Sequence, residues 1–156
     1  MKDMMLKSKV ALCLIILLFS CKDDEGLGEC ALIDCAAQTF ALEYIDVDGN
    51  NLIANNYYSL ENITITKDGE QLNFGQQQGD EVVYFFVAGT NGSNTYNIKL
   101  NDTETDELIL DLSRIKSDLE CCGPYFTVNS STYNDETIEI AEGQNSFIEK
   151  ITIVKP

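Results

Sequence analysis

Two loops rich in side-chain oxygens carry the residues whose spacing could hold a metal ion. Asp46, Asp48, Asn50 and Asn51 place four such side chains within six residues. Hard cations such as Ca²⁺ take about six to eight oxygen ligands from loops of this kind. Asp and Asn side chains also form turns by accepting hydrogen bonds from nearby backbone, so the same spacing is typical of a plain turn. Asp46, Asp48 and Asn50 are therefore candidate Ca²⁺ ligands, with an ordinary turn as the alternative.

A second acidic loop, Asp102 to Glu107, has the same two interpretations. The sequence contains no histidine, which excludes Ser-His-Asp and Cys-His nucleophile schemes. A pair of carboxylates could still hydrolyse a glycoside, but 26 acidic residues make some close pair inevitable. We therefore expect no catalytic residues, no enzyme activity and no cofactor other than the candidate Ca²⁺.

The first residues read as an export signal. Lys2, Lys7 and Lys9 precede an apolar run, Val10 to Phe19, that would reach only about 15 Å as a helix, half of a ~30 Å hydrocarbon core. The run ends in Leu18-Phe19-Ser20-Cys21, which resembles the lipobox of bacterial lipoproteins. The resemblance implies that Cys21 is lipidated and becomes the first residue of the mature chain. The alternative is an ordinary secretory signal.

Lys22-Asp23-Asp24-Glu25 follows the predicted lipidation site and is similar to the signal that sends Bacteroidota lipoproteins to the cell surface. This likeness implies a lipid-anchored protein of the outer membrane, on its outer side. The alternative is a solvated acidic tether on a protein that stays on the periplasmic side. Either way, the membrane is a predicted partner through the anchor.

The six cysteines of the chain also indicate an exported protein, because those outside the signal can pair as disulfides. Cys13 lies in the predicted signal and Cys21 takes the lipid, which leaves Cys30, Cys35, Cys121 and Cys122. An even number in an exported domain predicts two disulfides. A bond between Cys121 and Cys122 would close a strained ring, so we expect Cys30 and Cys35 to pair with them, in either order. A four-cysteine metal site and a redox-active pair are the alternatives.

Charge and length suggest one acidic domain. The chain carries a net charge of −16, and removal of residues 1–20, with three lysines and one aspartate, leaves −18. Such a charge repels nucleic acid and suits a basic partner. We expect a signal peptide over 1–20, a lipidated acidic tether over 21–36 and a folded domain over 37–156.

From about Phe40 onward, short apolar and β-branched runs alternate with turn residues. Leading examples are Phe40–Tyr44, Ile63–Ile65 with a return through Leu72 and Phe74, Glu81–Ala88, Tyr96–Leu100, Leu108–Leu112, Phe126–Val128, Ile138–Ile140 and Ile151–Ile153. Asp68-Gly69 between two such runs is a strong hairpin signal, and Glu81–Ala88 is apolar on both faces, typical of a central strand. Only Arg114 to Glu120 has a helical character.

Strands of this length and spacing predict an all-β fold, a single antiparallel β-sandwich of the immunoglobulin or transthyretin type with at most one short helix. The leading functional hypothesis is a non-catalytic binding or adhesion module with a protein or glycan ligand. The alternative is a structural or accessory subunit of an outer-membrane assembly. Tyr57, Tyr58, Tyr125 and Tyr133 are candidates for a ligand surface, although tyrosines in a sandwich also serve as half-buried packing.

Overall fold

The computed structural model describes residues 35, 37–75, 81–118, 121–142 and 148–156. Cys21, Cys30, the predicted signal peptide and the acidic run after Cys21 lie outside the described residues. The compact unit that contains the described residues is Cys35–Pro156.

The described residues form strands and connecting loops, with no helix among them. The strands are β1 Thr39–Ile45, β2 Thr64–Lys67, β3 Glu70–Gln71, β4 Phe74–Gly75, β5 Val83–Phe86, β6 Gly92–Lys99, β7 Thr105–Ile115, β8 Tyr125–Tyr133, β9 Glu136–Ile138, β10 Ala141–Glu142 and β11 Ile148–Val154. Within this part of the chain, no helix is long and apolar enough to cross a membrane.

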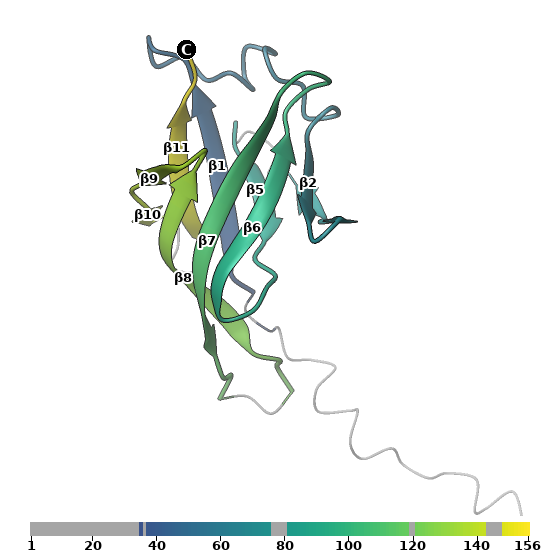
Figure 1. Ribbon diagram of the computed structural model, residues 1–156, viewed down its shortest axis with the longest axis vertical. Helices are drawn as coiled ribbons and strands as arrows, with labels where there is room; N and C mark the ends of the chain where they lie inside the picture. Colours follow the sequence, from purple (N-terminus) through teal and green to yellow (C-terminus); the bar gives the residue numbers. More distant parts are fainter. Residues whose placement is uncertain (1–34, 36, 76–80, 119–120, 143–147) are drawn as a thin grey trace, which may run out of the picture. The chain divides into compact units, whose positions relative to one another are not determined.

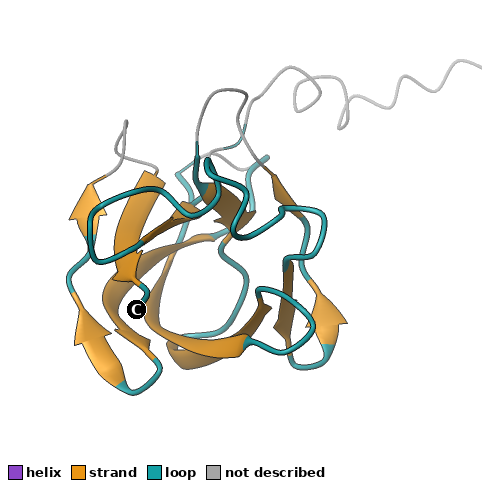
Figure 2. Ribbon diagram, turned by 90° about the horizontal axis from the view of Figure 1, so that it is seen from above, coloured by secondary structure: helices purple, strands orange, loops and turns teal. Residues whose placement is uncertain are grey.

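The strands build two sheets that face each other across one core (Figures 1 and 2). Sheet A has the order β10-β11-β1-β5-β4, and sheet B has the order β3-β2-β6-β7-β8-β9. The predicted β-sandwich is confirmed. The expectation that it is wholly antiparallel is wrong at one pair, because β1 and β11 run parallel from Thr39 opposite Ile148 to Ile45 opposite Val154. The parallel pair joins the first and last described strands across a long stretch of chain, which local turn signals do not predict.

The alternating residues of the central strands fill the core. Phe40, Leu42 and Tyr44 of β1 are fully buried, as are Tyr96 and Ile98 of β6. Burying one such aromatic or aliphatic side chain stabilises the fold by about 1.5–3 kcal/mol relative to leaving it in water. Period-two alternation therefore identified the inward face of β1, β6 and β7 from the sequence.

The hairpin predicted at Asp68-Gly69 is present between β2 and β3. Asp68 and Gly69 have φ of 53° and 85°, as a tight hairpin turn with two left-handed residues requires. The return strand is shorter than expected. It ends at Gln71, and the chain then crosses to sheet A, where Phe74 pairs with Phe85 in β4–β5.

Two further expectations are corrected. Arg114 and Ile115 belong to the end of β7, and residues 116–118 are not helical, because β7 continues its ladder with β8 as far as Ile115 opposite Tyr125. The strand expected to be buried on both faces is β5, but Phe86 is 61 % exposed. Nothing among the described residues covers the outer face of sheet A at this point, so one apolar face of β5 meets solvent.

Candidate functional site

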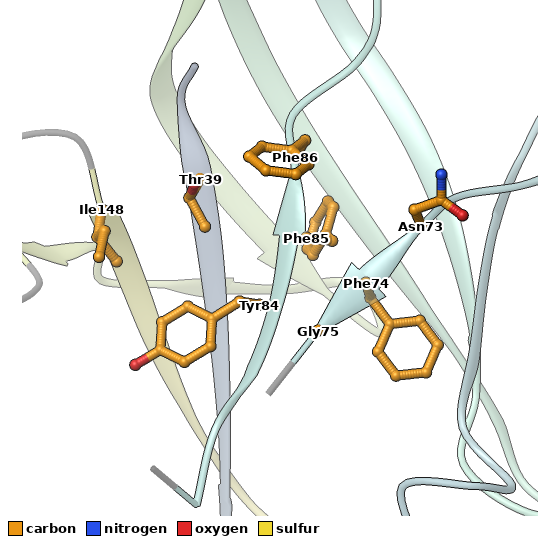
Figure 3. Close-up of a pocket in the computed structure, with 8 residues that line it drawn as sticks. All are labelled: Thr39, Asn73, Phe74, Gly75, Tyr84, Phe85, Phe86 and Ile148. Atoms are coloured by element: carbon orange, nitrogen blue, oxygen red, sulfur yellow. The ribbon is translucent and has the colours of Figure 1, made fainter. Parts of the chain in front are cut away.

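An uncharged pocket of about 410 Å³ lies on sheet A at the end where β1 begins and β5 ends. We call it the aromatic pocket. Figure 3 shows Tyr84 and Phe86 extending from β5 toward β1, with Asn73 and Phe74 on the side of β4. Its lining residues are Thr39, Asn73, Phe74, Gly75, Tyr84, Phe85, Phe86 and Ile148.

Strand register explains why these side chains meet. Thr39 lies opposite Phe86 on one side and Ile148 on the other, so these three form one row across sheet A. The next row places Tyr84 opposite Gly75. Side chains in one row of a sheet project from the same face, so β11, β1 and β5 present an isoleucine and two aromatic rings together.

Gly75 leaves the pocket open beside Tyr84. A Cβ built on Gly75 would meet no atom within 4 Å, and its backbone does not require a left-handed φ. A larger side chain there would therefore fill the pocket without straining the strand. No lining residue is charged, which is unusual on a surface that carries most of a net charge of −16.

A second distinctive region, which we call the Lys155 cluster, lies where β7 begins and β11 ends. The Lys155 ammonium donates to Glu104 Oε1 at 2.7 Å and to Asp106 Oδ2 at 2.5 Å. The Tyr58 hydroxyl donates to Glu104 at 2.9 Å, and the Tyr133 hydroxyl donates to Asp106 at 2.6 Å. Tyr44 contacts the Tyr133 hydroxyl at 3.2 Å. One cation and two carboxylates thus meet inside a shell of tyrosines.

Burial and hydrogen bonding set the ionisation of this cluster. Burial opposes the charged form of Asp106, but hydrogen bonds from Lys155, Tyr133 and Asn134 outweigh it and hold the pKa of that carboxyl below its usual range. Burial raises the pKa of the Tyr133 and Tyr44 hydroxyls, which therefore stay protonated and act as donors. The cluster is a structural tie between sheet A and sheet B, with every charge partnered.

The Asp46 loop takes the form of a turn. The Asp46 carboxylate accepts hydrogen bonds from the backbone N–H groups of Asp48 and Asn50 at 2.9 and 2.8 Å, and from the Asn50 side chain. These bonds lower the pKa of Asp46, the Asn50 side chain contributing most. In the described part of the chain, no three acidic or cysteine side chains group as metal ligands. Asp46, Asp48 and Asn50 remain candidate Ca²⁺ ligands, and their side-chain contacts are those of an Asx turn.

The second acidic loop is divided between solvent and core. Asp102 is exposed beside Lys99, whereas Glu104 and Asp106 turn inward to Lys155. Sequence reasoning missed this use of the loop. The alternating pattern of β7 could have revealed it, because Asp106 lies two residues before Leu108 and so faces the core with Leu108 and Leu110.

A disulfide joins Cys35 to Cys122, across 87 positions of sequence. Its Cα atoms lie 5.4 Å apart, within the usual range for a bridge. Cys121 is also disulfide-bonded, and Cys30 lies outside the described residues. The expected crossing from the segment before β1 to the adjacent cysteine pair is thus confirmed for Cys35, with Cys122 as its partner.

The four tyrosines proposed as a ligand surface do not form one, because half-buried Tyr125 begins β8 and Tyr133 ends it. Tyr58 and Tyr133 are buried in the Lys155 cluster, while Tyr57 is 67 % exposed and packs its ring on Tyr58. The aromatic residues that do share an open surface are Tyr84 and Phe86, which the sequence assigned to a buried central strand. Comparison with known proteins finds no family model, no curated protein and no solved structure that matches this chain.

Proposed function

We propose that the protein is a lipid-anchored, non-catalytic binding module of the outer membrane, and that it takes its ligand at the aromatic pocket. The observation that supports this most is the exposure of Phe86 beside Tyr84 and Ile148 in a pocket whose lining contains no charged residue. Apolar rings gathered in a concave surface bind ligands or partners far more often than isolated apolar residues do. The anchor rests on the likeness of Leu18 to Cys21 to a lipobox.

Anchoring is tested by acyl labelling of intact cells, followed by protease shaving. Wild-type protein should carry label and be cleaved by external protease, while Cys21→Ala should carry no label. An unlabelled wild-type protein would remove the anchor. Labelled protein that resists shaving would place it on the periplasmic side and remove an adhesive role at the cell surface.

The binding site is tested with two pocket variants and one control. Phe86→Ala removes the exposed ring, and Gly75→Leu fills the open space beside Tyr84, with little expected change in stability. Val47→Ala shortens another exposed apolar residue, 73 % exposed and outside the pocket. Envelope components that co-purify with wild type and with Val47→Ala should be lost from both pocket variants. Equal recovery with all four proteins would contradict the proposal.

A subunit role is the second candidate, because an exposed apolar patch is also typical of a permanent contact between proteins. Pull-down from detergent-solubilised membranes separates the two functions. A membrane protein recovered in a fixed stoichiometric ratio favours the subunit. Recovery of a ligand only when it is added favours the free binding module.

A further inference from the structure

One edge of sheet A is only partly covered. β10 pairs with β11 at Glu149 and Lys150, and no strand among the described residues continues that pairing along Ile151–Val154. β11 is held on its other side by β1 along its whole length. The second half of β11 is therefore a strand with one paired edge and one open edge.

Backbone direction shows which residues face the open edge. The backbone N–H of Lys155 donates to the carbonyl of Ile45, the last residue of β1, at 2.8 Å. The backbone polar groups of Lys155 therefore face β1. The N–H and C=O groups of successive residues face opposite sides of a strand. The backbone groups of Ile153 therefore also face β1, and those of Thr152 and Val154 face the open edge. Lys150, which has the same parity, is the residue that meets Ala141 of β10.

The edge of sheet B stands across from this open edge. β9 pairs with β8 on one side only, from Glu136 opposite Tyr133 to Ile138 opposite Ser131. Figure 1 shows β9 and β10 beside β11 at one side of the sandwich. A groove of about 530 Å³ lies between the two edges and is lined by residues that include Glu136, Ile138, Glu139, Thr152 and Val154.

We propose that this groove, which we call the edge groove, accepts an extended, basic segment of a partner protein as an added β-strand on β11. Open-edge backbone groups supply the hydrogen bonds in this mode of recognition. Basic character follows from the rim, where Glu136 and Glu139 are exposed, while the ammonium of Lys155 is already paired with Glu104 and Asp106. Net charge opposes a second copy of this acidic chain as the occupant. The proposal is independent of the aromatic pocket.

The binding test uses a short fluorescent peptide that alternates lysine and valine, with a matched peptide that alternates glutamate and valine. The lysine peptide should bind the domain, and the amides of Thr152 and Val154 should become protected from hydrogen exchange. The glutamate peptide should not bind at the same ionic strength. Failure of the lysine peptide to bind, or binding without protection of these two amides, would overturn the proposal.

Two pairs of variants locate the contact. Val154→Pro removes one outward N–H and should weaken binding by about tenfold, as expected for the loss of one hydrogen bond, while Val154→Thr should bind as wild type does. Glu136→Lys with Glu139→Lys should reduce binding, and Glu61→Lys, exposed outside the groove, should change it less. Urea unfolding of each variant verifies the fold.

The test also separates this inference from the proposed function. Phe86→Ala should bind the lysine peptide normally, because the aromatic pocket shares no residue with the edge groove. Loss of peptide binding in Phe86→Ala would contradict the edge-groove assignment. Loss of the envelope ligand without loss of the peptide would leave both assignments standing.

Discussion

The two ends of the sandwich are held together by different interactions, a disulfide at one end and a buried ion pair at the other. At the end where β1 begins, the Cys35–Cys122 disulfide joins the segment before sheet A to the β7–β8 connection of sheet B. At the end where β11 finishes, Lys155 joins sheet A to Asp106 of β7 through a buried ion pair. One tie is covalent and independent of pH, and the other depends on every charge keeping its partner. The aromatic pocket lies at the covalent end, where β1 begins.

The Lys155 cluster is the end where a single substitution should have the largest effect. Lys155→Met removes the cation and leaves Asp106, whose side chain is 6 % exposed, without a counter-charge. We expect a loss of about 3–5 kcal/mol in the free energy of unfolding. Urea denaturation measures it. Lys99→Ala is the matched control, because its partner Asp102 is exposed, and it should unfold as wild type does.

The disulfide should come next. In a chain whose Cys30 and Cys121 are already replaced by serine, so that no second bridge spans the same stretch, Cys35→Ser with Cys122→Ser opens a loop that spans 87 positions and should cost about 4 kcal/mol in the chain-entropy account. Urea denaturation of oxidised and variant proteins gives the value. With Cys35 bonded to Cys122, the remaining expected bridge is Cys30–Cys121, and mass spectrometry of an unreduced digest should find it. A digest that joins Cys30 to another residue would contradict the predicted pairing.

Acid should loosen the ionic end and leave the covalent end closed. The pKa of Asp106 is lower in the folded protein than in the unfolded chain, so its contribution is complete above about pH 4 and is lost as pH falls through the folded value. Urea titrations at decreasing pH should show this decline. In Lys155→Met this decline should be lost or reversed, because burial without the cation raises the carboxyl pKa, and protonation of a carboxyl whose pKa is raised by folding stabilises the folded state. Identical profiles would show that Lys155 does not set the ionisation of Asp106.

The smallest expected effect lies on β11 between the two ends. Glu149 Oε2 has no hydrogen-bond partner in the described part of the protein, and burial raises the pKa of this carboxyl, although Val128 N–H lowers it. Glu149→Gln removes a poorly solvated charge and should stabilise the fold at neutral pH by about 0.5 kcal/mol. Glu43→Gln should destabilise it, because Lys150 holds the pKa of Glu43 down. Thermal unfolding compares the two directly.

Most strands were predictable because their signals are local. Alternation at Tyr96, Ile98 and Leu100 gave both the strand and its buried face, and Asp68-Gly69 gave a hairpin. The parallel pairing of β1 with β11 was not predictable, because no turn connects them and their contact is decided by the packing of the whole sandwich.

The candidate sites were harder to predict from type and spacing. Asp106 and Glu104 were recognised as an acidic loop, but their partner Lys155 is distant in sequence and has no motif around it. Phe86 was assigned to the core because its strand is apolar throughout. An apolar strand is buried on both faces only when another element packs on the outer side of its sheet. Among the described residues, β5 has β4 beside it in the sheet and no element on its outer face.

The shared direction of β1 and β11 has a mechanical consequence. The chain enters this domain at the Cys35 end and leaves it at the Pro156 end, on strands that lie side by side. Tension applied between Cys35 and Pro156 would shear β1 and β11 along their length. The hydrogen bonds between the two strands would then resist the force together and would not break one after another. The bridge at Cys35 would pass part of that tension into β8. Such a module is built to resist being stretched along its axis.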